Sequence, residues 1–308
     1  MKNYLYLINY PILEKELALL EVRQLFNLNT EEKVFKSEIG IDPSDSAFIK
    51  SRMEIIYEKE SFQEILMELS EKPIKYEGFK VEYMRLDKDN IPYDERLSKV
   101  KEVGLKVIGN PNMYMPTTLF GLTYLKGKWI FGIYEKNNFL WNNHIDKPCS
   151  YSQSLGVKLA KSILNIATCG DKNLKVIDTC CGAGTIVIEA SFMGIDIAAY
   201  EINKSIAKDA NENLIHYGYK PIVINDDMHN INTKFDISIL DIPYGIFSHI
   251  TKEEQQSLIN KAAEISDKLI LISFEELAYM VEKTGLRIDD NCTLPKGKFK
   301  RYIYVCKK

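Results

Sequence analysis

The sequence predicts an α/β protein in which an α+β region precedes a mostly parallel, doubly wound sheet over residues 171–308. Beyond Asp171, short apolar runs alternate with amphipathic runs of helical length, which is the pattern of a parallel sheet covered by helices. A glycine-rich turn over residues 178–185 follows the first apolar run. Residues before 140 lack the regular alternation, so we expect a separate domain there.

The length, composition and cysteine spacing of the chain limit the classes of protein to which it can belong. The chain has 308 residues, 45% of them hydrophobic and 27% charged, which is enough for two domains with their own cores. The first eight residues alternate like a strand and soon meet Glu14 and Glu16, which argues against a secretory signal. No apolar run is long enough to cross a bilayer. The six cysteines contain no C-x-x-C pair, so we expect no metal and a reducing cytoplasm.

Charge is unevenly placed along the chain. The net charge of −3 and the pI of about 5.9 are not the bulk signature of a nucleic-acid binder. From Thr293 to the C-terminus, however, there is no acidic residue. This stretch is either a phosphate-facing patch or a solvated basic tail. Its basic residues are Lys296, Lys298, Lys300, Arg301, Lys307 and Lys308.

The N-terminal half reads as a small piece over residues 1–45 followed by a module over residues 46–140. Pro11 suits a helix start, and Ser61 with Glu64 forms a capping box that opens another helix. Aromatic and β-branched runs indicate the strands. The expected elements are strands at 4–9, 47–57, 79–83, 119–125 and 129–134 and helices after Pro11, after Ser61 and at 95–108.

The C-terminal half begins after a linker over residues 141–170, which contains an amphipathic helix at 154–167. Gly194 is expected to end the first helix of the sheet domain, and Asn203 to cap the next one. The last two apolar runs read as a hairpin that finishes the sheet. The runs before them are strands near residues 175–179, 196–201, 222–225, 236–242 and 268–273, with helices at 185–193, 203–217 and 252–265.

The glycine-rich turn predicts a nucleotide-like cofactor. Ligands of open parallel sheets lie beyond the carboxyl ends of the strands, where glycines let the backbone approach them. Val176–Asp178 supplies the strand, Gly182 and Gly184 the turn, and Thr185 the start of the helix. Glu201 ends the second strand, where an acidic residue can accept hydrogen bonds from both ribose hydroxyls.

Two further details bear on which cofactor binds. The third glycine of G-x-G-x-x-G is replaced by Val187, and Asp178 suits a positively charged sulfonium better than a pyrophosphate. These features favour S-adenosyl-L-methionine over NAD. After the third strand, Asp226 or Asp227 is expected to accept from the adenine amino group, with Met228 against the ring. The alternative for either acid alone is a strand end or a helix cap.

A second turn, Asp241-Ile242-Pro243-Tyr244, ends the fourth strand and predicts methyl transfer to an amine. The amino group of a guanine or adenine is a poor nucleophile because its lone pair is conjugated into the ring. Asp241 and the carbonyl of Ile242 can accept hydrogen bonds from that amino group. Pro243 would stiffen the turn and Tyr244 would stack on the base. Alone, this pattern is equally well explained as a tight turn with Tyr244 in the core.

At these two turns the sequence resembles the amino-methylating class of S-adenosylmethionine-dependent enzymes. Their hallmarks D-P-x-C-G-S-G-T and [D/N]-P-P-[Y/F] stand here as D-T-C-C-G-A-G-T and D-I-P-Y. Residues 147–155 and 164–167 look like the segment before the cofactor turn in the THUMP-bearing tRNA guanine-N2 methyltransferases. The resemblance departs at Thr179 and Ile242, which replace prolines, and the second change puts turnover and substrate base in doubt.

The resemblance implies a Rossmann-like class I methyltransferase domain over residues 171–308, its mostly parallel sheet closed by an antiparallel hairpin. It also implies a THUMP-like RNA-binding domain over 46–140, after a ferredoxin-like piece over 1–45. Gly182, Gly184, Glu201 and Asp226 would bind the cofactor, and Asp241 would hold the target amine.

The implied activity is methylation of a tRNA guanosine to N2-methylguanosine, with position ten as a candidate. Two alternatives stay open. One is an amine methyltransferase acting on rRNA, DNA or protein, because D-x-P-Y does not identify the molecule that carries the amine. The other is a catalytically weakened subunit that binds tRNA or depends on an activating protein partner, as Ile242 and the acidic pI suggest.

Overall fold

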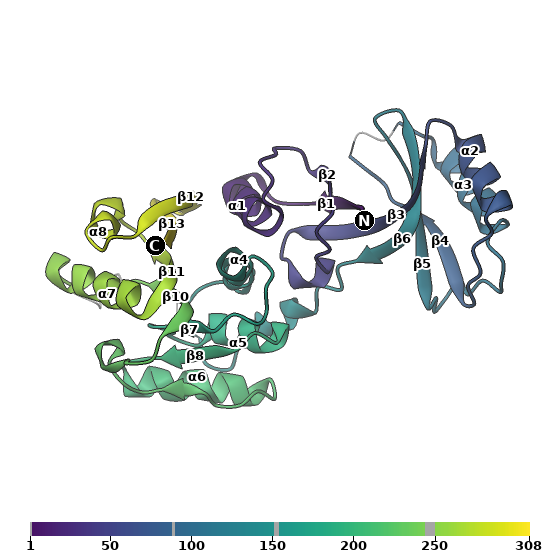
Figure 1. The fold of residues 1–308 in the computed structure, drawn as a ribbon. Helices are drawn as coiled ribbons and strands as arrows, with labels where there is room; N and C mark the ends of the chain where they lie inside the picture. The colour runs from purple at the N-terminus through teal and green to yellow at the C-terminus, as the bar shows by residue number, and fades with distance from the viewer. Residues whose placement is uncertain (1, 88–89, 151–153, 244–249) are drawn as a thin grey trace. The chain divides into compact units, whose positions relative to one another are not determined.

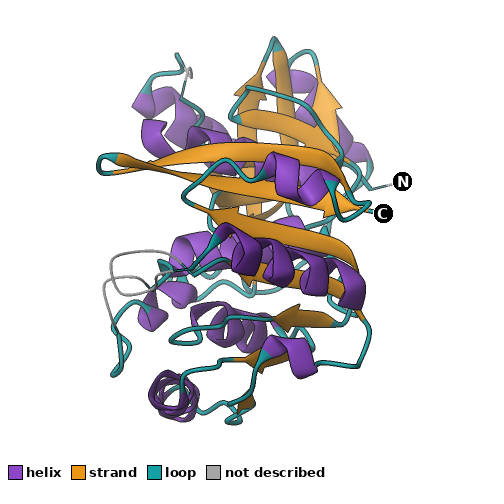
Figure 2. Ribbon diagram, turned by 90° about the vertical axis from the view of Figure 1, so that its left-hand side faces the viewer, coloured by secondary structure: helices purple, strands orange, loops and turns teal. Residues whose placement is uncertain are grey.

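The computed structural model describes residues 2–87, 90–150, 154–243 and 250–308 (Figures 1 and 2). The chain divides into two compact units. Unit 1 comprises Met1–Asn9, Glu32–Ser44 and Phe48–Asn138, and unit 2 comprises Tyr10–Glu31, Asp45–Ala47 and Phe139–Lys308. Each unit is therefore built from three separate stretches of the chain, and the expected boundary at residue 45 stays a prediction.

Unit 1 is built on a six-stranded sheet in the order β2-β1-β3-β6-β5-β4. Neighbouring strands are antiparallel except β4 and β5, which run parallel. The hairpin turn between β5 and β6 has positive φ at Lys126 and Gly127, as a two-residue turn of this hand requires. The strands are β1 (Tyr4–Ile8), β2 (Val34–Ser37), β3 (Ile49–Lys59), β4 (Phe79–Tyr83), β5 (Thr118–Leu125) and β6 (Lys128–Lys136).

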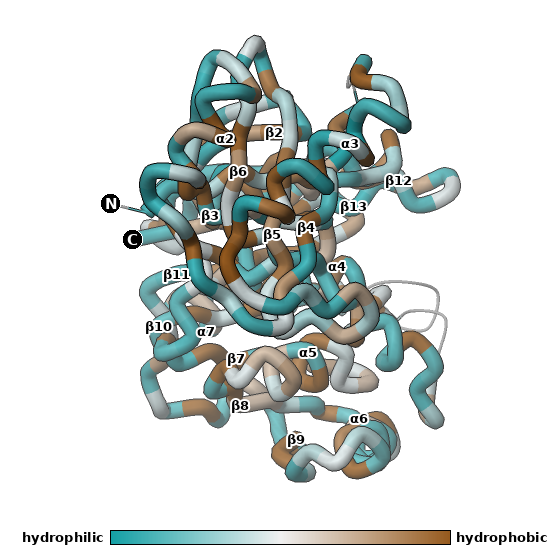
Figure 3. Tube along the Cα trace, turned by 90° about the vertical axis from the view of Figure 1, so that its right-hand side faces the viewer, coloured by the Kyte–Doolittle hydropathy of each residue, from teal (hydrophilic) through white to brown (hydrophobic). Residues whose placement is uncertain are grey.

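Two helices, α2 (Phe62–Glu71) and α3 (Tyr93–Gly104), pack on the sheet of unit 1. The predicted capping box is confirmed, because Ser61 accepts from Glu64 N and Glu64 accepts from Ser61 N. Helix α3 begins and ends earlier than expected. Pro92 precedes it, and proline suits the start of a helix because a backbone N–H there would have no partner within the helix. Brown, hydrophobic segments mark β4, β5 and β6 (Figure 3), and they supply the core against these helices.

Unit 2 contains a seven-stranded sheet in the order β12-β13-β11-β10-β7-β8-β9. The five strands from β11 to β9 run parallel, and β13 is antiparallel to both β11 and β12. This topology confirms the predicted α/β class with a terminal antiparallel hairpin. The strands are β7 (Val176–Asp178), β8 (Ile197–Tyr200), β9 (Val223–Ile224), β10 (Phe235–Asp241), β11 (Ser266–Ser273), β12 (Arg287–Lys296) and β13 (Phe299–Lys307).

Helices cover both faces of this sheet. Helices α7 and α8 pack in one apolar cluster with alternate residues of β10 and β11, while α4 contacts the same strands through other residues. None of the helices in the described residues is both long and apolar enough to span a membrane. The helices are α1 (Lys15–Phe26), α4 (Val157–Thr168), α5 (Thr185–Met193), α6 (Lys204–His216), α7 (Lys252–Ile265) and α8 (Ala278–Glu282), with short 3-10 helices at Ile12–Glu14, Pro43–Asp45, Leu140–His144 and Met228–Asn230.

Helix α1 belongs to unit 2 although it lies near the start of the chain. It packs on α4 and β12. Arg23 donates through Nε and Nη2 to the two carboxylate oxygens of Asp290, both at 2.9 Å. The amide of Asn165 in α4 donates to Glu21 at 2.5 Å, and Glu21 is buried. Specific polar contacts therefore fix α1 to the sheet domain.

Candidate active site

The carboxyl ends of β7, β8 and β10 meet at two adjoining cavities in unit 2. The first, of about 290 Å³, is lined by the glycine-rich turn, Glu201 and the Asp241 turn. The second, of about 360 Å³, is lined by the segment after β9 and the start of α7. Both are bordered by Cys180, Glu201, Ile202 and Pro243. Nearly all the described residues singled out in the sequence therefore gather at one edge of the sheet.

The turn between β7 and α5 needs glycine at two positions. Gly182 and Gly184 have φ of 53° and 77°, a region that side chains other than glycine rarely adopt. A Cβ at Gly184 would also lie 3.3 Å from Ala210 in α6. Gly184 is not among the residues that line the two cavities, so the structure gives it a packing role under the turn, and its contact with a cofactor stays a prediction.

Glu201 lies between the two cavities and is only 9% exposed. Its Oε2 accepts from Gly182 N at 3.0 Å and its Oε1 from Asn203 N at 2.8 Å. Each carboxylate oxygen can accept a further hydrogen bond. The side chain is thus fixed by the backbone of the turn it faces, with acceptor capacity remaining for a pair of neighbouring hydroxyl groups.

The two candidate adenine-binding acids are each engaged through one carboxylate oxygen. Asp227 Oδ1 accepts from His229 N at 2.9 Å and contacts His229 Nδ1 at 2.8 Å, so it caps the short helix after β9. Asp226 Oδ1 accepts from Asp227 N and from Asn230 Nδ2. Both acids and the buried Met228 line the second cavity. The choice between Asp226 and Asp227 as the acceptor for a ligand stays a prediction.

Two buried carboxyl groups face the first cavity. Asp178 and Asp241 each have an Oδ1 atom that is buried and has no hydrogen-bond partner within the described residues. Burial raises the pKa of Asp178 to about 8, reinforced by the charge of Asp241. Burial also raises the pKa of Asp241 to about 7, against the opposing effect of Arg301 and Lys296. Unpaired buried carboxylates are costly, so a cation or N–H donors placed here would be strongly attracted.

The two residues that replace prolines use the N–H groups that proline would lack. Thr179 N and Thr179 Oγ1 both donate to the carbonyl of Ile239 in β10, each at 3.0 Å. Ile242 N donates to the carbonyl of Ile272 in β11 at 3.0 Å, and its side chain is buried in the core. The acceptor turn is thus held to the neighbouring strand by a hydrogen bond and by packing. The effect of Ile242 on turnover and on the substrate base stays a prediction.

Replacing Ile242 with proline is expected to destabilise unit 2 by about 1–3 kcal/mol, because the buried Ile272 carbonyl would lose its donor. The measurement is the free energy of unfolding from urea denaturation, with Ile242→Val as the control that keeps the N–H. An Ile242→Pro protein as stable as the wild type would show that the hydrogen bond to Ile272 does not hold the turn.

The structure adds a tether that the sequence analysis missed. The buried side chain of Asn213 in α6 accepts from Cys149 N at 2.8 Å and donates to the carbonyls of Cys149 and Ala183 at 2.7 and 3.0 Å. Lys147 Nζ donates to Thr185 Oγ1 at 2.8 Å. These bonds hold Lys147 and Cys149 against α5 and α6. The signal was available, since Asn213 lies on the inward face of a helix with apolar neighbours.

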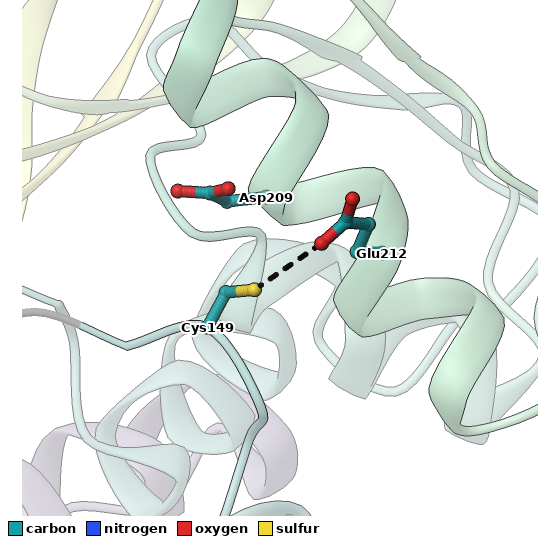
Figure 4. Close-up of side chains that lie close together, drawn as sticks. All are labelled: Cys149, Asp209 and Glu212. Carbon is teal, nitrogen blue, oxygen red and sulfur yellow. Dashed lines mark hydrogen bonds between the residues drawn. The ribbon is translucent and has the colours of Figure 1, made fainter.

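Figure 4 shows Cys149 beside two acids of α6. Its thiol donates to Glu212 at 3.6 Å, and the donor atoms of Cys149, Asp209 and Glu212 lie within 4.8 Å of one another. Burial and the two acids raise the pKa of the thiol, so it stays protonated. Exposed acids at such spacing are common without a metal, and we assign the cluster to the same tether.

The remaining residues of the site fall into four groups. Pro243 lines both cavities as expected of the acceptor turn. Tyr244 lies outside the described residues. Burial raises the pKa values of Cys180 and Cys181, so both thiols stay neutral and pack under the turn instead of acting as nucleophiles. Arg301 and Lys296, whose charges act on Asp241, were seen in the sequence only as part of a basic tail.

Comparison with known proteins finds a family model that matches part of the chain. The model of the UPF0020 family, described as an RMKL-like methyltransferase domain, matches residues 146–270. A curated relative, the tRNA (guanine(10)-N2)-dimethyltransferase of Methanothermobacter thermautotrophicus, is 29% identical over 167 residues, which are 51% of this chain and 48% of that protein. The chain therefore spans about half the length of that relative.

Solved structures give weaker likenesses. TrmN from Thermus thermophilus is 15% identical, covers 99% of both chains and has a TM-score of 0.49. A magnesium protoporphyrin IX methyltransferase from Synechocystis PCC 6803 with bound S-adenosylmethionine is 19% identical over 44% of this chain and 71% of its own, with a TM-score of 0.38. Similarity of this size carries no argument about substrate.

Proposed function

We propose that the whole chain is an S-adenosyl-L-methionine-dependent tRNA methyltransferase acting on the exocyclic N2 of a guanosine. The match of residues 146–270 to the RMKL-like methyltransferase domain family supports this proposal. The proposed product is N2-methylguanosine, with position ten as a candidate because the curated relative is named for that position. An activity on the amine of an rRNA, a DNA or a protein is the competing outcome.

One observation carries the proposal. Asp241, at the end of β10, lines the same cavity as the glycine-rich turn after β7, and its Oδ1 atom is buried and has no hydrogen-bond partner within the described residues. Strands β7 and β10 are adjacent and parallel, with Asp178 paired to Ile239. A group held by Asp241 and a ligand held by the turn would therefore be neighbours, as direct transfer between them requires.

Residues around the two cavities offer contacts to the ribose, the adenine and the sulfonium of the proposed cofactor. Glu201 has acceptor capacity for two ribose hydroxyls, and Asp226 with Met228 lines the space for an adenine. The unpaired Asp178 oxygen offers a negative charge to a sulfonium. The positive φ of Gly182 lets the backbone approach the ligand. When bound, the cofactor supplies an electrophilic methyl group.

The chain's own contribution is to hold and expose the amine. The Asp241 carboxylate and the Ile242 carbonyl accept hydrogen bonds from the two N–H groups of the guanine amine, which turns its lone pair outward. Because Ile242 is anchored to β11, these acceptors are positioned before the substrate arrives. Rate then comes from orientation and electrostatic preorganisation, without a covalent intermediate.

The experiment that tests the proposal is incubation of the purified chain with radiolabelled S-adenosyl-L-methionine and undermodified tRNA, followed by digestion to nucleosides. Labelled N2-methylguanosine is expected. No label in tRNA, with the cofactor bound in calorimetry, would contradict the proposal. Parallel incubations with rRNA, DNA and cell protein then show whether another amine is the substrate, and addition of cell extract tests for an activating subunit.

Cofactor affinity is expected to rise with pH. Asp178 has a raised pKa of about 8, so below that pH a proton must leave before the carboxylate can pair with the sulfonium. Affinity should therefore increase by up to about tenfold per pH unit from pH 6 to 8 and then level off. Calorimetric titrations across this range measure it, with Asp178→Asn expected to flatten the dependence.

S-adenosylhomocysteine is the matched control for this pH dependence, because it has a neutral thioether in place of the sulfonium. Its affinity should change much less between pH 6 and 8. Equal pH dependence for the two ligands would show that Asp178 does not face the sulfonium.

We assign RNA binding to the N-terminal region, residues 46–140, as a THUMP-like domain. The support is its position before the family-matched region, and four strands of the six-stranded sheet of unit 1, β3 to β6, lie within it. All six cysteines are free, which fits the reducing cytoplasm that we propose for the protein.

A further inference from the structure

The closed end of the β12–β13 hairpin is unusually basic. Residues Lys296 and Phe299 pair across a turn in which Gly297 has φ of 62°. Lys296, Lys298 and Lys300 are exposed. Figure 2 shows the hairpin reaching beyond the other strands of its sheet. Its closed end is therefore accessible to a ligand from several sides.

The two ends of the hairpin differ in how their lysines are paired. At the open end, Lys307 contacts Asp289 at 2.7 Å and Lys308 contacts Asp267 at 2.5 Å. At the closed end, no acidic residue follows Thr293 in the sequence. Among the described residues, Lys298 and Lys300 form no salt bridge with an acid. Within the described residues, Lys298 and Lys300 at the closed end therefore carry positive charge that no salt bridge compensates, unlike Lys307 and Lys308 at the open end.

Aromatic rings accompany these charges. The guanidinium of Arg301 lies 4.8 Å from the centroid of the Phe274 ring, and Lys296 Nζ lies 5.7 Å from it. The Phe299 ring meets Phe274 edge-on, with centroids 6.4 Å apart. Phe299 itself is 69% exposed. An exposed ring on a basic hairpin offers a stacking surface beside positive charge.

The register of the sheet puts this cluster beside the acceptor turn. Asp241 in β10 pairs with Ile272 in β11, and Ser273 pairs with Tyr302 in β13. Phe274 follows that pair on one strand and Arg301 precedes it on the other. The charges of Arg301 and Lys296 act on Asp241. A molecule whose amine reaches Asp241 would therefore extend over the hairpin end.

We propose that this basic-aromatic cluster (Phe274, Lys296, Lys298, Phe299, Lys300 and Arg301) binds the nucleotides flanking the methylated guanosine. The lysines contact backbone phosphates and Phe299 stacks on a flanking base. Lysine and arginine bind phosphates, and aromatic rings stack on unpaired bases. A guanine whose amine is modified must leave its helix, so its neighbours are open to such contacts. The inference rests on the proposed function for the identity of the target.

The experiment compares two double variants that remove the same charge from the two ends of one hairpin. K298A/K300A tests the closed end, K307A/K308A is the matched control, and Phe299→Ala tests stacking. Binding of a tRNA transcript and of a short single-stranded RNA is measured over a salt series. For K298A/K300A, the slope of log affinity against log salt should fall by about one per lost phosphate contact. Phe299→Ala should weaken binding about tenfold with little change in slope.

The outcomes separate this inference from the proposed function. If wild-type protein methylates tRNA but K298A/K300A keeps the wild-type affinity and slope, the cluster assignment is wrong while the function stands. If tRNA is not methylated but K298A/K300A alone loses affinity for single-stranded RNA, the cluster is an RNA site of an enzyme with another target. Equal loss in K307A/K308A, or equal competition by polyglutamate and RNA of the same charge, would overturn the inference. Unchanged cofactor binding shows that each variant is folded.

Discussion

Replacing Asp241 with asparagine is expected to lower methyl transfer at least about a hundredfold, the usual loss when a positioned electrostatic group is removed from an active site. Asparagine has nearly the same volume, but it replaces one acceptor oxygen with an N–H donor that would oppose the substrate amine. Asp241 Oδ1 is buried and unpartnered within the described residues, so the change leaves no internal contact broken there. Turnover of labelled cofactor on tRNA measures the loss.

Asp236→Asn is the control, because Asp236 lies at the other end of the same strand, where it accepts from Lys175 N. That variant should keep activity within about twofold, since asparagine retains the carbonyl acceptor. Cofactor affinity of Asp241→Asn should stay near the wild-type value. A variant that retains more than a tenth of the wild-type turnover would remove Asp241 from the transfer step.

Replacing Glu201 with glutamine is expected to weaken cofactor binding about a hundredfold. The carboxylate accepts from the backbone of both Gly182 and Asn203, and charge-assisted hydrogen bonds of this kind contribute about 1.5–3 kcal/mol each. Glutamine keeps one acceptor oxygen but turns an amide donor toward one of these N–H groups. Both the glycine-rich turn and the proposed ribose site are therefore disturbed by a single substitution.

Calorimetry with S-adenosylhomocysteine measures the Glu201→Gln effect without turnover. Glu253→Gln, on the exposed start of α7, is the matched control and should bind as the wild type does. Wild-type affinity in Glu201→Gln, with the fold intact by circular dichroism, would show that the ligand does not lie against Glu201.

Local sequence patterns predicted the parts of the site that depend on neighbours along the chain. Strand Val176–Asp178, helix Thr185–Met193 and its C-cap at Gly194 match the structure, because glycines and apolar periodicity act over a few residues. Asn203 caps α6 through its side chain as predicted. Their convergence on one sheet edge followed from the rule that parallel strands end on the same side.

Other features depend on contacts between distant parts of the chain. The Asn213 tether joins α6 to Cys149, and the β12–β13 hairpin brings Arg301 toward Asp241. The spacing of residues along the sequence predicts neither contact, since both depend on how helices and strands pack. The hydrogen bond that anchors Ile242 depends likewise on the neighbouring strand, so local sequence patterns do not predict it.

The assignment of α1 to the sheet domain has a consequence for the order of synthesis. Helix α1 leaves the ribosome before its partners α4 and β12, which begin at Val157 and Arg287. The apolar face of α1 therefore stays exposed until these later segments have been synthesised. A fragment that starts after residue 31 would lack this helix and leave the buried Asn165 without Glu21. In evolution, too, the two units cannot be exchanged by a single crossover, because each is built from three separate stretches of the chain.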